Sequence, residues 1–555
     1  MRWPAPNGSE AAVDPTLASA LSILTVLVIV AAVHVPLGTW IHWVFTSPRH
    51  SRVERAVYRL VGVDPDTEQR WWVYGLSVLA FSSVSIVLLW VFLLAQDVLP
   101  WSFGRALNVD TAFNTAVSFV TNTNWQSYAG EAGTGYLVQA AGLTVQNFLS
   151  AGVGLAVAIA VVRGLARERT DRIGNFWVDL TRGTLRLLLP IAAVAAVVLV
   201  AGGVIQNLTE PTTVTTIAGG QQVVQGGLVA SQETIKELGT NGGGFFNANS
   251  AHPFENPSGW TNLLEILLIL VVPSALPYTY GLMVKDRRQG LAMAGAMAVL
   301  AFGAMSLLTW IETAGASMEG KEQRFGPAWS AIFASATTGT STGAVDAMHS
   351  SLQPLGGGVA LLNMMLGELS PGGVGTGLYS MLVMVVITVF IAGLMVGRTP
   401  ELLGKQIGRR EITLVALSML ITPTLVLLGT AIALVDPASL AAMSTSGPHG
   451  LSEMLYAFTS AANNNGSAFA GLSADQPFLN IALAVCMLGG RFVPIIAMLA
   501  FAGGVARQKR RPVTAGTMPT HTPSFAGFLV VIILIMSGLT YFPSLALGSI
   551  AEALQ

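Results

Sequence analysis

The sequence predicts an all-α polytopic membrane protein: ten transmembrane helices, grouped into four pseudo-fourfold membrane-pore-membrane repeats with one flanking helix at each end. Three observations support this fold class. Of the 555 residues, 52% are apolar and only 10% are charged, as is typical of membrane proteins. Ten apolar runs are long enough to cross a bilayer, and four short polar loops recur at similar intervals.

The apolar runs are the first element of the prediction. About 20 residues at 1.5 Å rise per residue cross the ~30 Å hydrocarbon core. The seventh run is interrupted by glycines. The predicted spans are 16–36, 72–96, 137–162, 183–206, 262–284, 290–311, 356–396, 412–434, 478–503 and 525–548.

The recurring loops share a three-residue theme of Thr or Ser, Asn and Gly, and lie about 100 to 125 residues apart, at 121–123, 240–242, 341–343 and 464–466. Amphipathic or small-residue segments of about ten residues precede them, which predicts helices that cross half of the membrane. These segments are 111–120, 231–239, 328–339 and 451–462. The spacing predicts repeats over about 71–163, 183–284, 290–397 and 412–504, flanked by helices at about 16–36 and 525–548.

Positive charge predicts the orientation. Of the 28 Lys and Arg residues, 22 lie in connections on one side of the predicted helices, at 49–70, 163–186, 285–288, 398–410 and 507–511. The positive-inside rule places this side in the cytoplasm, so the four loops and both termini are expected outside. Only Arg2 precedes the first acidic residues, and no small-residue cleavage site follows the first run, so we expect an uncleaved helix.

Several protein classes and sites are disfavoured. A net charge of −1 and scattered basic loops argue against nucleic-acid binding. A single cysteine, Cys486, excludes an intrachain disulfide and is expected to pack in the interior. His252 and His449 are expected to form structural hydrogen bonds rather than a metal site. The Thr- and Gln-rich alternation in 207–229 predicts a small external hairpin.

The four loops have the chemistry of a site for a dehydrated monovalent cation. Backbone carbonyls at the end of a short helix provide uncharged oxygen ligands, and Gly242, Gly343 and Gly466 permit positive φ or a close backbone approach. No Asp or Glu lies in any triplet, which disfavours a divalent ion. Gly and Asn are common in any loop, but four such loops in register favour the site.

Seven characteristic strings are spread along the chain: TNTNWQ (121–126), TNGGGFFNANSAHPFENP (240–257), DRRQG (286–290), MEGKEQRFG (318–326), AGLMVGRTPELLGK (392–405), GPHGLSEMLYA (447–457) and ANNNGSAFAGL (462–472). In these residues the chain resembles, from end to end, the potassium-binding subunits of the bacterial Kdp potassium-transporting ATPases. This family belongs to a superfamily of potassium transporters built from four membrane-pore-membrane repeats.

The resemblance implies a K⁺ filter and a set of residues around it. The filter residues are Asn122, Asn124, Thr240, Asn241, Gly242, Ser341, Thr342, Gly343, Asn464, Asn465 and Gly466. Gln126 is implied to influence selectivity from the rim.

The break in the seventh run, at 367–377, predicts a gate or barrier beneath the filter. Irregular backbone is tolerated at membrane depth only inside protein or beside water. Glu368 and Arg491 are expected to face the interior, because a charge near the bilayer centre costs about 2.5 to 3.5 kcal/mol or more. The barrier residues are Glu368, Gly373, Gly375, Thr376 and Arg491. The alternatives are a packing kink, and pairing of the two charges with each other or with backbone carbonyls.

The chain is not expected to be an enzyme by itself or to hold a cofactor. It has neither a Gly-x-x-x-x-Gly-Lys phosphate loop nor an Asp-Lys-Thr-Gly phosphorylation motif. The resemblance implies three partners in the bacterial inner membrane: a P-type ATPase subunit that uses ATP and Mg²⁺, a single-span accessory subunit, and a small membrane peptide. The alternatives are a Trk- or Ktr-like transporter and a channel, and one short triplet per loop disfavours a multi-ion channel.

Overall fold

The computed structural model describes residues 14–395, 397, 399–512 and 517–555, and within them ten helices are long and apolar enough to span a membrane. The ten-span prediction is confirmed. The spanning elements are α1 (Pro15–Thr46), α3 (Trp71–Leu94), α6 (Thr144–Ala166), α7 (Phe176–Arg182) continued by α8 (Leu189–Ala201), α10 (Gly259–Met283), α11 (Arg287–Gly315), α14 (Thr376–Met395), α15 (Arg409–Ala433), α18 (Pro477–Arg507) and α19 (Pro523–Leu545).

Two features at the start of the chain differ from the sequence expectation. α1 continues ten residues beyond the predicted end at residue 36, with Pro36 inside it. Its Gly38 lies so close to α10 that an added Cβ would be 2.8 Å from the Ala275 carbonyl oxygen, so packing outweighs the local cost of proline. The amphipathic α2 (Arg52–Val61), capped reciprocally by Ser51 and Glu54, was not expected.

The four predicted half-membrane helices are present. They are α4 (Val109–Val120), α9 (Val229–Leu238), α12 (Gly326–Thr338) and α17 (Gly447–Asn463). The seventh apolar run is divided as expected, into α13 (Pro354–Met365) and α14, with an irregular segment between them. The glycine-rich break therefore separates two helices rather than bending one.

Several shorter elements connect these helices. They include α5 (Gly130–Gly133), α16 (Pro437–Ala442), α20 (Ala551–Ala553) and, among the described residues, three two-stranded antiparallel pairs: β1 (Gln69–Arg70) with β2 (Arg172–Gly174), β3 (Thr212–Thr215) with β4 (Gln221–Val224), and β5 (Glu401–Leu402) with β6 (Lys405–Gln406). The β3–β4 pair confirms the predicted hairpin.

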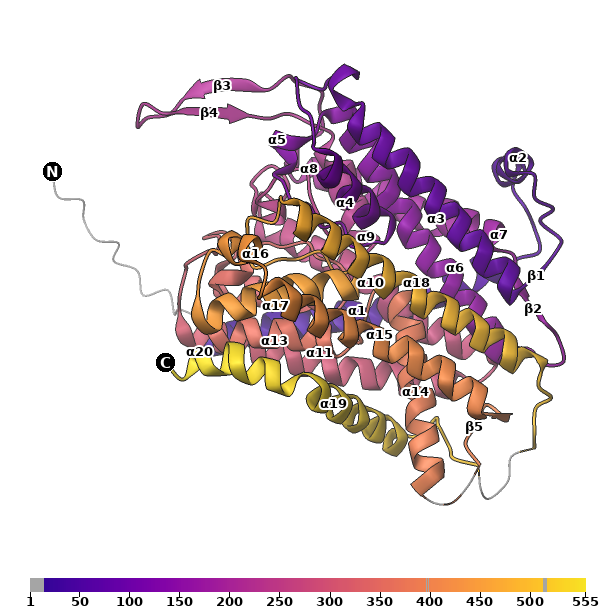
Figure 1. The fold of residues 1–555 in the computed structure, drawn as a ribbon. Helices are drawn as coiled ribbons and strands as arrows, with labels where there is room; N and C mark the ends of the chain where they lie inside the picture. The colour runs from indigo at the N-terminus through magenta and orange to yellow at the C-terminus, as the bar shows by residue number, and fades with distance from the viewer. Residues whose placement is uncertain (1–13, 396, 398, 513–516) are drawn as a thin grey trace.

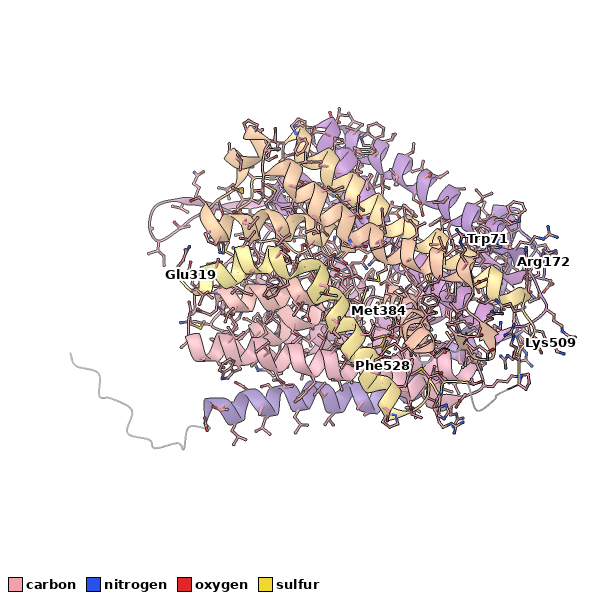
Figure 2. All side chains as sticks on the ribbon, turned by 60° about the horizontal axis from the view of Figure 1, so that its bottom comes forward. Trp71, Arg172, Glu319, Met384, Lys509 and Phe528 are labelled. Atoms are coloured by element: carbon pink, nitrogen blue, oxygen red, sulfur yellow. The ribbon has the colours of Figure 1, made fainter. Side chains whose placement is uncertain are left out.

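The basic connections gather at one end of the molecule. β1, β2 and β5 lie at the end opposite the β3–β4 hairpin and α20 (Figure 1). Figure 2 shows Arg172 and Lys509 together at one end and Glu319 at the other. The Arg511 amide donates to the Gly404 carbonyl at 2.7 Å, joining two of these connections. Arg2 and Arg398 lie outside the described residues.

Labelling with a membrane-impermeant thiol reagent tests the predicted orientation. In a Cys486→Ala background, which removes the single cysteine, Ile217→Cys should react in intact cells because Ile217 is fully exposed in the hairpin turn. Arg288→Cys, at the basic end, should react only after the cells are opened. Labelling of residue 288 and protection of residue 217 in intact cells would contradict this orientation.

Candidate ion-binding site

The four loops that follow α4, α9, α12 and α17 converge around Gly242. A Cβ added to Gly242 would lie 2.8 Å from the carbonyl oxygen of Thr123, 2.9 Å from that of Thr342 and 3.1 Å from that of Asn465. These three oxygens come from the other three loops. Carbonyl oxygens from three separate loops thus lie around one glycine, which is the arrangement expected of a dipole-based cation site.

Close approach is repeated at the equivalent glycines. A Cβ on Gly343 would collide with the Asn465 carbonyl, and one on Gly466 would collide with the Thr123 carbonyl. Gly343 and Gly466 have positive φ values of 86° and 105°. Gly242 is not among the positive-φ residues, so glycine is needed there only because a Cβ would crowd the neighbouring carbonyl oxygens.

The polar side chains of the loops bond to protein groups. Asn122 donates to the Thr240 carbonyl at 2.6 Å, and Asn464 donates to the Thr123 hydroxyl at 3.0 Å. Three other contacts run to neighbouring helices: Asn124 to the Asn147 side chain, Asn241 to the Asn147 carbonyl, and Asn465 to the Thr337 carbonyl. Within the third loop, the Thr342 hydroxyl contacts that of Thr340. These bonds fix the backbone and leave carbonyls as the oxygens at the centre.

Gln126 ties the first loop to the second. Its side-chain oxygen accepts from the Gly244 amide at 2.9 Å, and its amide nitrogen lies 3.4 Å from the Tyr128 hydroxyl. The side chain is half-buried. It therefore lies beside the residues that follow Gly242, and its location at the filter rim stays a prediction.

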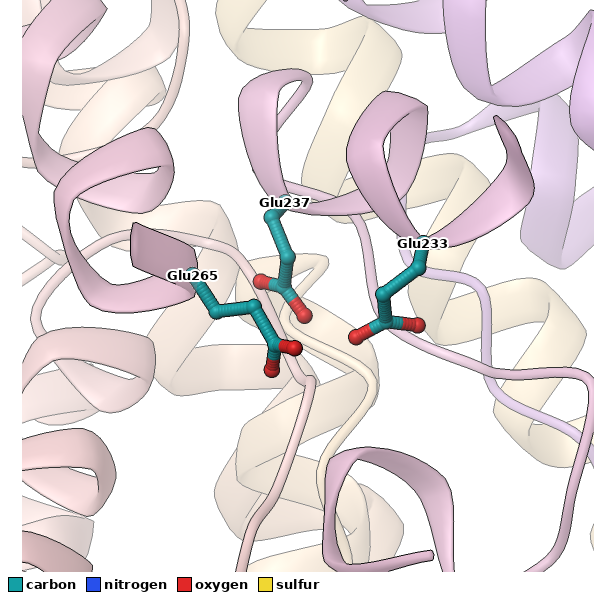
Figure 3. Close-up of side chains that lie close together, drawn as sticks. All are labelled: Glu233, Glu237 and Glu265. Atoms are coloured by element: carbon teal, nitrogen blue, oxygen red, sulfur yellow. The ribbon is translucent and has the colours of Figure 1, made fainter. Parts of the chain in front are cut away.

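A buried charge network stands behind the second loop and was not predicted. The Lys236 ammonium of α9 lies 2.6 Å from Glu233, 3.4 Å from Glu237 and 3.5 Å from Glu255. Glu265 of α10 points toward Glu233 and Glu237 (Figure 3), and oxygens of these three carboxyls lie within 4.8 Å of one another. Burial raises the pKa of Glu255 to about 8, which favours its neutral form.

This network holds the second and third loops together through Asn249. The Lys236 ammonium donates to the Asn249 side-chain oxygen at 3.0 Å, which also accepts from the Val345 amide at 3.2 Å. The Asn249 amide nitrogen donates to the Gly243 carbonyl. The sequence did carry a signal for this network, because one lysine and two glutamates lie within the ten residues of α9 in an otherwise apolar chain.

The broken segment between α13 and α14 lies against the second and third loops. The Ser370 and Gly372 amides donate to the Gly339 carbonyl at 3.2 and 2.9 Å, and the Val374 amide donates to the Thr240 hydroxyl at 2.9 Å. A Cβ on Gly373 would lie 2.9 Å from the Ser341 hydroxyl oxygen. The segment is therefore hydrogen-bonded at Thr240 to the start of the second loop, and at Gly339 to the residue that leads into the third loop.

Two more barrier residues belong to the same contacts. The Thr376 hydroxyl lies 3.5 Å from that of Ser341. A Cβ on Gly375 would collide with the backbone of Gly154 in α6. The break is therefore clamped between the third loop and α6.

Glu368 and Arg491 are both buried, as expected, but do not pair with each other among the described residues. The Glu368 carboxylate accepts from the Ser341 hydroxyl and, at 2.8 Å, from the Asn465 amide. Arg491 donates to the Ser150 carbonyl at 3.2 Å. Of the two pairing alternatives, the bond to a carbonyl is correct for Arg491. The mutual pair is wrong because nearer neutral partners satisfy Glu368.

A cavity of about 120 Å³ adjoins these residues. Its polar lining includes Ser341, Glu368, Thr376, Asn464 and Thr540. The remaining walls come from α13, α14, α15, α17, α18 and α19 and from the segment at 366–369. The cavity borders the third and fourth loops, at Ser341 and Asn464.

The histidines are structural, as expected. His252 accepts from the Phe254 amide at 3.0 Å and stacks on Phe246, and burial lowers its pKa to about 4. His449 lies 2.9 Å from Glu552. Cys486 is buried.

Comparisons with known proteins agree with the geometry. The chain is 60% identical to a potassium-transporting ATPase potassium-binding subunit of Kineococcus radiotolerans, over 95% of this chain and 97% of that protein. It is 57% identical to the Streptomyces coelicolor protein of the same description, over 98% and 100%. The potassium transporter TrkH of Vibrio parahaemolyticus shares the fold at 15% identity, with a TM-score of 0.53 over 87% of this chain and 96% of that one.

The match to a family model covers almost the whole chain. Residues 24–554 match the model described as KdpA, potassium-transporting ATPase A subunit. Together with the two bacterial relatives, this match covers all four loops and the broken seventh run. The chain therefore belongs to the KdpA family, the potassium-binding subunits of potassium-transporting ATPases.

Proposed function

We propose that the chain binds one extracellular K⁺ at the four loops and delivers it to a P-type ATPase subunit. The observation that carries the proposal is the set of three carbonyl oxygens, from Thr123, Thr342 and Asn465, around Gly242. Carbonyl dipoles held by side-chain hydrogen bonds replace part of the hydration shell of a monovalent ion. Thr123 joins the filter residues implied by the resemblance.

The ion leaves sideways in this proposal. The broken segment behind the second and third loops obstructs a straight path, and the cavity beside Glu368 and Thr376 offers a polar space next to the filter. Glu368 attracts the ion there. Arg491, whose Nη1 has no hydrogen-bond partner among the described groups, opposes leak.

The assembly and topology follow from the same proposal. The P-type ATPase partner hydrolyses ATP with Mg²⁺, and the single-span accessory subunit together with the small membrane peptide completes the complex. The repeats are 71–163, 183–284, 290–397 and 412–504, and both termini are extracytoplasmic. A Trk-like transporter or a channel needs no ATPase, so a requirement for ATP in reconstituted flux separates these alternatives.

A Gln126→Arg variant tests the filter. The change removes the acceptor for the Gly244 amide and puts a cation at the rim, where like charge repels K⁺. We expect the K⁺ concentration for half-maximal uptake to rise about tenfold, with normal expression. Gln222→Arg, in the exposed hairpin strand β4, is the matched control. Equal uptake curves for both variants would contradict the rim position of Gln126.

A further inference from the structure

A second cavity lies at the basic end of the molecule. It measures about 720 Å³ and is lined by the ends of α1, α6 and α10, by α7 and by the segments at 47–50 and 65–68. The ion site uses none of the residues that line it. The two sites are therefore separate.

Most charges on its wall are already neutralised. Arg163 forms a bidentate pair with Asp179, at 2.5 and 2.8 Å. Arg167 forms another with Glu68, at 2.8 and 2.7 Å. Asp66 is exposed and lies 3.8 Å from His50, whose pKa is lowered mainly by burial, so this contact does not neutralise the carboxylate. Among the described lining residues, Asp66 is therefore the one carboxylate that pairs with no lysine or arginine.

Two cations on the wall have no such partner. Among the described residues, neither Arg182 nor Lys285 forms an ion pair with a carboxylate. Arg182 is only 5% exposed, and its Nη2 lies 3.3 Å from the Arg49 carbonyl and 3.4 Å from His50 Nδ1. The Tyr58 hydroxyl also contacts the guanidinium, but no hydrogen bond of ordinary geometry satisfies the buried Nε. Burying a guanidinium with an unused hydrogen-bond donor costs free energy unless an anion accepts a hydrogen bond from it.

The depth of the cavity indicates where that anion comes from. The 32 residues of α1 span ~48 Å at 1.5 Å per residue, more than the ~30 Å hydrocarbon core. Its last turns therefore reach headgroup depth. Trp43, 55% exposed in those turns, has the Arg186 guanidinium 5.8 Å from its ring centroid, as expected at a membrane interface.

We propose that this cavity binds the phosphate group of an anionic phospholipid in the cytoplasmic leaflet. Arg182 donates to the phosphate oxygens from the buried wall, and Lys285 approaches from the rim. Basic pockets between helix ends on this side of a membrane suit such headgroups. The exposed apolar side chains in the cytoplasmic half of α1, Val35 and Pro36, accommodate the acyl chains.

Lipid retention on the purified complex tests the proposal. The complex is placed in nanodiscs of phosphatidylcholine with phosphatidylglycerol, re-extracted in detergent, and bound lipid is counted by native mass spectrometry. Wild type should retain phosphatidylglycerol over phosphatidylcholine, and Arg182→Gln/Lys285→Gln should retain about tenfold less. The control Arg288→Gln/Lys509→Gln removes the same charge from the same end and should match wild type. Equal retention by the two double variants would overturn the site.

Two further arms address folding and the source of the phosphate. Lys285→Gln alone changes only an exposed side chain, so it should fold and still lower retention severalfold; retention equal to that of Lys509→Gln would count against the site. Inorganic phosphate at millimolar concentration should not displace the lipid. Displacement by inorganic phosphate, with equal retention of both lipids, would assign the cavity to a free anion and overturn the lipid proposal. K⁺ uptake is not the readout, so the result is independent of the proposed ion site.

Discussion

Replacing Gly242 with aspartate is expected to abolish high-affinity K⁺ uptake and to reduce discrimination against Na⁺. The new Cβ would lie 2.8 to 3.1 Å from three carbonyl oxygens, so those oxygens must move apart. The carboxylate adds a full charge to a site built from dipoles, and a charged ligand holds smaller cations more strongly. We expect the concentration for half-maximal uptake to rise at least tenfold, about 1.4 kcal/mol or more.

The measurement is uptake of K⁺ in competition with Na⁺ by cells that depend on the complex. Gly259→Asp is the matched control, because a Cβ on Gly259, at the start of α10, meets nothing within 4 Å. Gly242→Ala separates the effect of side-chain volume from that of the added charge. It should lower the affinity for K⁺ but disturb the selectivity for K⁺ over Na⁺ less than aspartate does. If Gly242→Asp assembles with its partners and keeps the wild-type preference for K⁺, the carbonyls around it do not form the filter.

Much of the architecture was predictable because its signals are local. Twenty consecutive apolar residues need no partner to specify a span. The half-membrane helices and the glycine-rich break at 367–377 are also visible in short windows of sequence. The uncharged loop triplets predicted a carbonyl-based site, and the structure brings these four loops together.

What could not be predicted depends on contacts between distant residues. Lys236 meets Asn249 and Glu255 only after α9 and the following segment fold together. Glu368 meets Asn465, 97 positions away, so its partner could not be inferred from charge alone. Thr123 was the third residue of its triplet, but only convergence with Gly242 identifies its carbonyl as central.

Shortening the break between α13 and α14 is expected to produce the second large effect, a passive K⁺ leak. The Val374 amide bonds to the Thr240 hydroxyl, and Gly373 lies against Ser341. Deleting Gly373 and Val374 withdraws the segment from the second and third loops. If that segment blocks a straight path, K⁺ should then cross without ATP, whereas the intact complex should need hydrolysis by its ATPase partner.

Potassium flux into proteoliposomes without ATP tests whether the deletion of Gly373 and Val374 opens a passive path. Deletion of Ala218 and Gly219, in the exposed hairpin turn, removes the same number of residues and should leave the membrane tight. K⁺ binding to the purified deletion variant checks that its loops still fold. A variant that binds K⁺ and shows no more flux than the control would identify the break as a packing kink. The barrier would then lie elsewhere. Arg491, which contacts α6 at the Ser150 carbonyl, is the next candidate, and Arg491→Gln would be the variant expected to leak.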